Sequence, residues 1–284
     1  MKKEGKHMPN PMHFDTPSAN VSFCSERSDD ARSLDCCHCH EDYEILYVLR
    51  GEGCYVVEGD EYTMSEGTLM LIRPLKYHFV RIDSGVIYER YVVHFSPSAL
   101  IPEAAALLEQ MEEHAETGNG HFYPSHALPP SVMEAFARLS GIARMPHAMQ
   151  SAYFKTLLSE IVLLLSTASA ERLPNDNDDL SVRVLRYLND HLEETIPLDS
   201  LARQFFVSKY YLCRAFKKHN GISIHMYVTQ KRVMQAKRLI EAGESASSAA
   251  YRVGFGDYSA FYRAFVKVTG HSPVSKTKPN EKEV

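Results

Sequence analysis

A short segment in the N-terminal half gathers residue types that bind metals and polar ligands. The stretch HCHEDYEILYVLRG places His38, His40, Glu44 and Gly51 at the spacing H-x-H-x3-E-x6-G. Residues two apart in a strand point to the same face, so the first two imidazoles can share a face. His78, in the separate stretch PLKYH, could converge with them. Three imidazoles and a carboxylate suit a first-row divalent metal, so the pattern indicates a binding site.

Three interpretations of this site remain open. In the first, an organic effector occupies a pocket and no cofactor is required; in the second, a divalent metal is bound; in the third, buried histidines are satisfied by backbone carbonyls. The effector pocket would be lined by His38, His40, Glu44, Tyr47, His78 and His94, and the metal would be held by His38, His40, Glu44 and His78. The nearby thiols of Cys36, Cys37 and Cys39 could bind a soft metal or sense oxidants, although small buried or edge thiols are commoner.

The C-terminal half contains an internal duplication. At an offset of 49 residues Leu212 matches Phe261, Arg214 matches Arg263 and Phe216 matches Phe265. Just upstream, an i, i+3, i+4, i+7 apolar pattern recurs at an offset of 48 residues. Each copy therefore predicts a short helix, a tight turn and a second helix, capped by Ser208 in the first copy and by Asp257 in the second. This is the order of a helix-turn-helix unit.

The second helix of each copy carries an apolar face and a polar, cationic face. Arginine can bond guanine or phosphate through two donors, and tyrosine can pack on a thymine methyl group. The alternative is an ordinary solvated face. We expect the DNA contacts to come from Ser208, Lys209, Tyr210, Cys213, Arg214 and Lys217 in the first copy, and from Tyr258, Ser259, Tyr262, Arg263 and Lys267 in the second.

One helix is predicted to join the two copies, over residues 222–242 with Gly243 as its stop. At 1.5 Å per residue it would span about 31 Å. Successive major-groove openings on one side of B-DNA lie about 34 Å apart. A rigid helix of this length would let one chain read two neighbouring groove segments. Gly254 suits the turn of the second copy, whereas Phe206 makes the first turn looser or strained.

These residues resemble the AraC/XylS family of transcription regulators. The family pattern A-x-x-VGF-x-D-x-S-x-F-x-R-x-F-K-x-x-x-G-x-x-P is met, with the lysine one place late, by Ala250, Val253, Gly254, Phe255, Asp257, Ser259, Phe261, Arg263, Phe265, Lys267, Gly270 and Pro273. The likeness implies a DNA-binding regulator, more often an activator, that contacts RNA polymerase. It also implies that the N-terminal half resembles a cupin-like sensor.

The segments around these motifs fit that organisation. Between residues 21 and 95 short β-branched and aromatic runs alternate with glycine turns, which is typical of an all-β barrel or sandwich. Amphipathic helices are predicted near residues 104–115, 132–142 and 152–165. The last is apolar on more than one face, which is typical of a helix at a subunit interface, and so of a homodimer, and equally of an ordinary core helix.

Charge and composition separate the two halves. From Leu180 onward there are 17 Lys and Arg against 9 Asp and Glu, and before it 14 against 27, so a polyanionic partner suits the basic end. No membrane span or signal-peptide pattern appears, and we expect a cytoplasmic protein with reduced thiols and no membrane partner.

The predicted fold class is α+β multidomain. We expect a flexible tail at 1–20, a cupin-like β-barrel at 21–100, a helical dimerisation segment at 101–170, a linker at 171–180 and a double helix-turn-helix domain at 181–284. Within the last, the units are 198–218 and 246–268. The predicted function is regulation of transcription at double-stranded DNA in response to a small-molecule effector, without enzymatic activity. The alternative is a metal-dependent cupin enzyme, an isomerase or dioxygenase, fused to a DNA-targeting domain.

Overall fold

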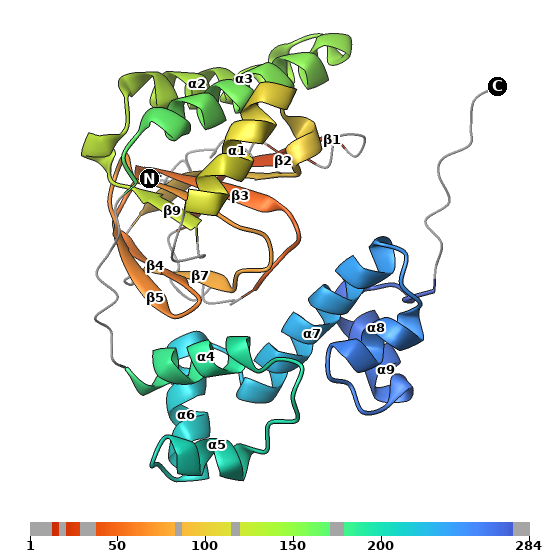
Figure 1. Cartoon of the computed structure of the whole chain (residues 1–284). Coiled ribbons are helices and arrows are strands. Elements are labelled where there is room, and N and C mark those ends of the chain that lie inside the picture. The colour runs from red at the N-terminus through yellow and green to blue at the C-terminus, as the bar shows by residue number, and fades with distance from the viewer. Residues whose placement is uncertain are drawn as a thin grey trace, which may run out of the picture. The chain divides into compact units, whose positions relative to one another are not determined.

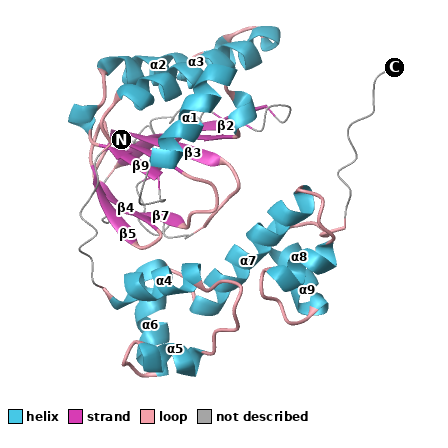
Figure 2. Cartoon of the chain, in the orientation of Figure 1, coloured by secondary structure: helices cyan, strands magenta, loops and turns pink. Residues whose placement is uncertain are grey.

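The computed structural model describes residues 13–16, 21–28, 38–82, 87–114, 120–170 and 179–274. The chain divides into two compact units, Met1–Asp176 and Asn177–Val284. Figure 1 shows strands and helices in the first unit and helices in the second unit. The colouring by secondary structure in Figure 2 makes the same division plain, which confirms the predicted fold class.

The N-terminal unit contains two antiparallel sheets. One has the strand order β1-β2-β8-β3-β6-β9 and the other the order β5-β4-β7. The strands are β1 (His13–Thr16), β2 (Val21–Ser28), β3 (Tyr43–Arg50), β4 (Gly53–Val57), β5 (Asp60–Met64), β6 (Leu69–Ile72), β7 (His78–Arg81), β8 (Tyr88–Phe95) and β9 (Gly120–Tyr123). Among the described residues, no strand pairing closes the two sheets into a barrel, so the predicted barrel takes the form of two facing sheets.

Strand β3 explains why this unit has two cores. Ile45 and Tyr47 belong to the core between the six-stranded sheet and the helices, whereas Leu46 and Val48 belong to the core between the two sheets. Successive side chains of a strand point to opposite faces, so one apolar strand supplies both cores. Glu44 has the same parity as Leu46 and therefore faces the smaller sheet.

Three helices cover the outer face of the six-stranded sheet, as Figure 1 shows. They are α1 (Pro102–His114), α2 (Pro130–Ser140) and α3 (His147–Thr167), with the short 3-10 turns η2 (Pro97–Ala99), η3 (Ser125–Ala127) and η4 (Ile142–Arg144). Large α3 side chains such as Phe154, Leu158 and Ile161 are fully buried, and each such burial stabilises the fold by about 1.5–3 kcal/mol. The three predicted helices are confirmed, although α3 begins earlier than expected.

Two strands correct the expected boundaries. Residues 13–16 form β1, paired with β2, inside the segment expected to be a flexible tail. Strand β9 lies inside the segment expected to be helical and pairs with β6, from Leu69 to Ile72. Both strands have four residues and lie outside the series of strands and glycine turns between residues 21 and 95, so no repeating pattern around them marks them, and their stability comes from the neighbouring strand.

The C-terminal unit contains six helices among the described residues. They are α4 (Leu180–Asp190), α5 (Leu198–Gln204), α6 (Lys209–Asn220), α7 (Ile224–Glu241), α8 (Ala246–Arg252) and α9 (Tyr258–Thr269). The two predicted helix-turn-helix units are α5–α6 and α8–α9, joined by α7. Helix α4, which packs against α6, was not predicted. None of the helices in the described part of the chain is both long and apolar enough to cross a membrane.

The joining helix is shorter than predicted. Helix α7 has 18 residues, which corresponds to about 27 Å rather than about 31 Å. The Ser223 hydroxyl accepts a hydrogen bond from the backbone N–H of Met226 at 3.2 Å, so the helix begins at Ile224. Gly243 follows its C-terminal end with a φ of 99°, as expected for a stop.

Candidate sensor site and nucleic-acid interface

The carboxylate of Glu44 is the centre of a polar cluster inside the N-terminal unit. Its Oε2 lies 3.0 Å from His40 Nε2, 3.2 Å from His78 Nε2 and 2.9 Å from His94 Nε2. The Tyr55 hydroxyl donates to the other oxygen, Oε1, at 2.8 Å. Glu44 and His78 are buried, whereas the side chains of His40 and His94 are 22% and 31% exposed. The cluster is therefore closed on one side and open to solvent on the other.

Sheet register brings these residues together. Glu44 on β3 lies directly opposite His94 on β8. His38 forms an isolated bridge with His78, which begins β7. The cluster thus joins residues from the six-stranded sheet with residues at the edge of the smaller one.

Backbone carbonyls fix the orientation of two of the imidazoles. His40 Nδ1 lies 2.9 Å from the carbonyl oxygen of Asp42, and His78 Nδ1 lies 2.8 Å from that of Lys76. A carbonyl oxygen only accepts, so each Nδ1 carries the proton, and in a neutral ring Nε2 is left as a lone-pair donor. When the rings are neutral, both Nε2 atoms direct lone pairs at the Glu44 carboxylate, an arrangement that a bound cation would stabilise. When the rings are charged, Nε2 carries a proton and donates to that carboxylate instead.

The ionisation of Glu44 reflects the same geometry. Burial alone raises the pKa of this carboxyl, but the charge of His78 and hydrogen bonds with His40 and His94 together hold the pKa well below its usual value. The Tyr55 phenol behaves in the opposite way: burial, followed by the nearby Glu44 charge, raises its pKa well above the usual value. Glu44 is therefore an anion and Tyr55 a neutral hydrogen-bond donor.

The donor atoms fit a divalent metal. The ligand atoms of His38, His40, Glu44 and His78 all lie within 4.8 Å of one another. Ligands about 2.1 Å from an ion are about 3.4 Å apart in tetrahedral coordination and about 3.0 Å apart in octahedral coordination, close to the 3.0 and 3.2 Å from Glu44 Oε2 to His40 and His78. Within the part of the chain that the structure describes, the buried His78 Nε2 has no well-aligned hydrogen-bond partner, despite its short distance to Glu44. Carbonyl bonds to Nδ1, as in His40 and His78, are the usual outer support of metal-binding histidines.

Not every predicted residue joins this cluster. Tyr47 lies on the opposite face of β3, where its ring stacks on Phe136 at 5.0 Å in the helix-facing core. Its inclusion in the effector pocket was wrong, because 44 and 47 differ by an odd number and so point to opposite faces. Tyr55 was missed, since only the fold brings β4 to β3. Cys39 is half-buried, and Cys36 and Cys37 lie outside the described residues.

The second helices of the duplicated units, α6 and α9, begin at the predicted caps. The Ser208 side chain accepts from the N–H of Tyr211 at 3.2 Å. Asp257 accepts from Ser259 at 3.2 Å and from Ala260 at 2.8 Å. Both predicted N-caps are confirmed, so α6 begins directly after Ser208 and α9 directly after Asp257.

The two inter-helix turns have the same backbone form. Gly254 has a φ of 91° and its N–H bonds the carbonyl of Tyr251 at 3.0 Å. Phe206, at the matching position, has a φ of 57° and its N–H bonds the carbonyl of Arg203 at 3.1 Å. The first turn is therefore strained rather than looser, by about 1–2 kcal/mol for a side chain in the left-handed region. The ring of Phe206 is 94% exposed, so no packing offsets this cost in the unit by itself.

Most of the predicted DNA contacts lie on the surface of these two helices. Arg214 and Arg263 are exposed and are each the sixth residue of their helix. The other exposed contacts are Lys209, Tyr210, Lys217, Ser259, Tyr262 and Lys267. Ser208 is exposed but is used as a cap, and Cys213 and Tyr258 are half-buried. Lys209 also has an ion pair with Asp199 at 3.0 Å, so a DNA phosphate would have to replace the Asp199 carboxylate as its partner.

Two family models match the chain. A model described as the AraC-like ligand binding domain matches residues 21–164, and a helix-turn-helix domain model matches residues 201–277. The first contains the Glu44 cluster and the second contains both recognition helices. Because members of this family are transcription regulators, the alternative of a cupin enzyme with a DNA-targeting tail is set aside.

The chain is similar to curated relatives and to solved structures. The HTH-type transcriptional activator RhaS of Salmonella arizonae is 29% identical over 242 residues, covering 83% of this chain and 85% of that protein, and RhaS of Salmonella paratyphi A is 29% identical over 244 residues with the same coverage. Among solved structures, ToxT from Vibrio cholerae is 12% identical and covers 89% of this chain and 96% of its own, with a TM-score of 0.37. The C-terminal domain of AraT from Geobacillus stearothermophilus is 26% identical, covers 38% of this chain and 98% of its own, and has a TM-score of 0.33. These TM-scores add nothing to the assignment, which stands on the family models: the chain belongs to the AraC/XylS family of DNA-binding transcription regulators with an N-terminal ligand-binding domain.

Proposed function

We propose that the protein activates transcription in the cytoplasm by reading two neighbouring major-groove segments with α6 and α9. The observation that carries this proposal is the equivalence of Arg214 and Arg263, exposed at the same position of two duplicated helices that one continuous helix joins. The activating sign, and with it a contact to RNA polymerase, is supported by relatives that are named transcriptional activators.

The same proposal assigns control of DNA binding to the Glu44 cluster. The open side of the cluster, at His40 and His94, gives a small effector access to a buried anion and to several imidazoles. An effector can change DNA affinity only through the difference in its affinity for the DNA-bound and free arrangements. Couplings of this kind are typically about 1–3 kcal/mol, or about 5- to 150-fold in affinity.

Selection from a randomised duplex library tests the proposal. For each bound chain, the enriched sequences should contain two constant segments about one helical turn apart, and footprinting should protect both. Enrichment of a single segment, or of none, would contradict reading by both helices.

A second candidate, favoured by the orientation of the imidazoles, is that the sensor holds a divalent metal. His40, Glu44 and His78 would bind it, with His38 completing the set that lies within 4.8 Å. A bound metal would supply a positive centre to which an anionic or oxygen-bearing effector could bind. The residues of the chain would set the geometry, since Asp42 and Lys76 hold two of the rings in place through their carbonyls.

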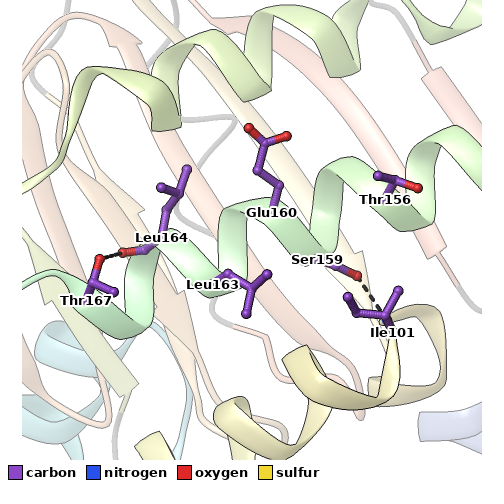
Figure 3. Close-up of a pocket in the computed structure, with 7 residues that line it drawn as sticks. All are labelled: Ile101, Thr156, Ser159, Glu160, Leu163, Leu164 and Thr167. Carbon is purple, nitrogen blue, oxygen red and sulfur yellow. Dashed lines mark hydrogen bonds between the residues drawn. The ribbon is translucent and has the colours of Figure 1, made fainter.

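We also propose that the protein forms a homodimer through α3. Most of the apolar side chains of α3 are buried in the core, but Leu163 and Leu164 are only partly buried. Leu163 lines a groove of about 420 Å³ beside Ile101, with Thr156, Ser159, Glu160, Leu164 and Thr167 (Figure 3). Apolar lining on the surface of a helix suits burial by a second copy.

Sedimentation of the full chain measures this interface. We expect the mass of two chains for the wild type and of one chain for Leu163→Lys. A lysine at this position would place a charge in a groove that the second copy would bury. Met133→Lys is the control, since Met133 is an apolar side chain on α2 that is 55% exposed, and it should leave the dimer intact. A monomeric wild type, or a dimeric Leu163→Lys, would exclude this interface.

A further inference from the structure

The guanidinium of Arg232, in the middle of α7, bonds three backbone carbonyls from two different parts of the C-terminal unit. Its Nε donates to the carbonyl of Leu192 at 2.7 Å and its Nη2 to that of Glu194 at 2.6 Å. Its Nη1 donates to the carbonyl of Gly254 at 2.8 Å. The first two carbonyls belong to the segment between α4 and α5, and the third to the turn between α8 and α9. One side chain therefore ties the segment that leads into the first helix-turn-helix unit to the turn of the second unit, and α4, at the start of that segment, packs against α6.

Only arginine can make this set of bonds. Its five N–H donors are fixed in one plane, so three of its nitrogens can reach three separate carbonyls at once. Partial burial lowers the pKa of Arg232, yet a guanidinium stays charged at neutral pH, so all three bonds are charge-assisted. Lysine would bring a single nitrogen on a flexible stem and could not hold the same three acceptors.

The contact between the α4–α5 segment and the turn of the second unit is close as well as polar. A Cβ atom on Gly254 would lie 2.5 Å from the carbonyl oxygen of Glu193 and 3.0 Å from Arg232 Cζ. Glycine is therefore required both by the positive φ of the turn and by the approach of the α4–α5 segment. Arg232 and Arg263 of α9 also border the same groove of about 570 Å³, so the guanidinium lies near a recognition helix.

We propose that Arg232 is a positioning residue that fixes the separation and rotation of α6 and α9, and so determines the spacing of DNA segments that the protein accepts. This proposal rests on the proposed reading of two groove segments. When both helix-turn-helix units are held in one geometry, binding of the first unit to DNA places the second unit at its own DNA segment, so that the second binding step is effectively intramolecular. Loosening the Arg232 contacts would weaken this coupling without removing any DNA-contacting side chain.

The test compares spacing preference among variants of the full chain. The probes are the duplex selected by the wild type, the same duplex with one base pair inserted between its segments, and one with the second segment scrambled. We expect Arg232→Gln and Arg232→Lys to bind the intact duplex about 10- to 100-fold more weakly and to lose the preference for intact over inserted spacing. Binding to the scrambled duplex, which offers one segment, should be unchanged.

Arg238→Gln is the matched control, because Arg238 is an exposed arginine on the same helix, and it should keep the wild-type spacing preference. The proposal is overturned if Arg232→Lys behaves as the wild type, or if the variants weaken binding to the scrambled duplex as much as to the intact one. Amide hydrogen exchange without DNA separates this proposal from the proposed function. Residues 192–194 and the turn at 254 should exchange faster in Arg232→Gln than in Arg238→Gln, whatever DNA the protein reads, and equal exchange would also overturn the proposal.

Discussion

Glu44→Gln is expected to abolish metal binding by the N-terminal unit while leaving its fold intact. The amide of glutamine has nearly the same volume as the carboxylate of glutamate, and the Tyr55 hydroxyl can still donate to the amide oxygen. The anion that balances the metal charge is lost, however, together with the oxygen that lies 2.9–3.2 Å from three imidazoles. Since changes in merely supporting residues already cost about 10- to 100-fold in metal affinity, the loss here should be at least about 100-fold.

Elemental analysis after incubation with Zn²⁺ or Ni²⁺ and dialysis gives the metal content directly. Thermal unfolding gives a second measure: at free metal of about 100 times the dissociation constant, the wild type should gain about 2.7 kcal/mol of stability and the variant almost none. Glu66→Gln is the control, because it makes the same chemical change at an exposed carboxylate of the same unit. Metal-free wild type after incubation, or equal loading of Glu44→Gln, would exclude the metal site and leave the organic effector pocket and the structural role of the histidines.

Arg214→Ala and Arg263→Ala should each weaken binding to the selected duplex by about 1–3 kcal/mol, which is about 5- to 150-fold. The physical reason is the loss of a charge-assisted contact from an exposed guanidinium at the centre of a recognition helix. Base preference should relax at one position in the first segment for one variant and in the second segment for the other. Titration of each variant against duplexes with single base-pair changes measures this.

The two variants control for each other, because the duplication places them in different segments, and Arg238→Ala controls for the loss of one positive charge. Weakening that is uniform over all sequences, with the salt dependence reduced by about one phosphate contact, would instead identify the arginine as a phosphate contact. An unchanged affinity for both variants would contradict the proposal that these helices read DNA.

The sequence alone determined the features that depend on neighbouring residues. The caps at Ser208 and Asp257, the positive φ at Gly254 and the apolar faces of the paired helices are all found where they were predicted. Local hydrogen bonds and a period of 3.6 residues specify such features within one or two turns, so they can be read from short stretches. The duplication strengthened the prediction of the helix-turn-helix units, because the same apolar and capping pattern occurs in both copies.

The tertiary structure decided what joins distant parts of the chain. Strand register placed His94 opposite Glu44, the facing of the two sheets brought Tyr55 to it, and neighbouring strands stabilised the four-residue strands β1 and β9. In the sequence Arg232 is one of several cations in its helix, and only folding brings to it the carbonyls of the α4–α5 segment and of the α8–α9 turn. Sequence specifies which groups are available, but their convergence depends on packing and strand pairing over tens of residues, which no local pattern records.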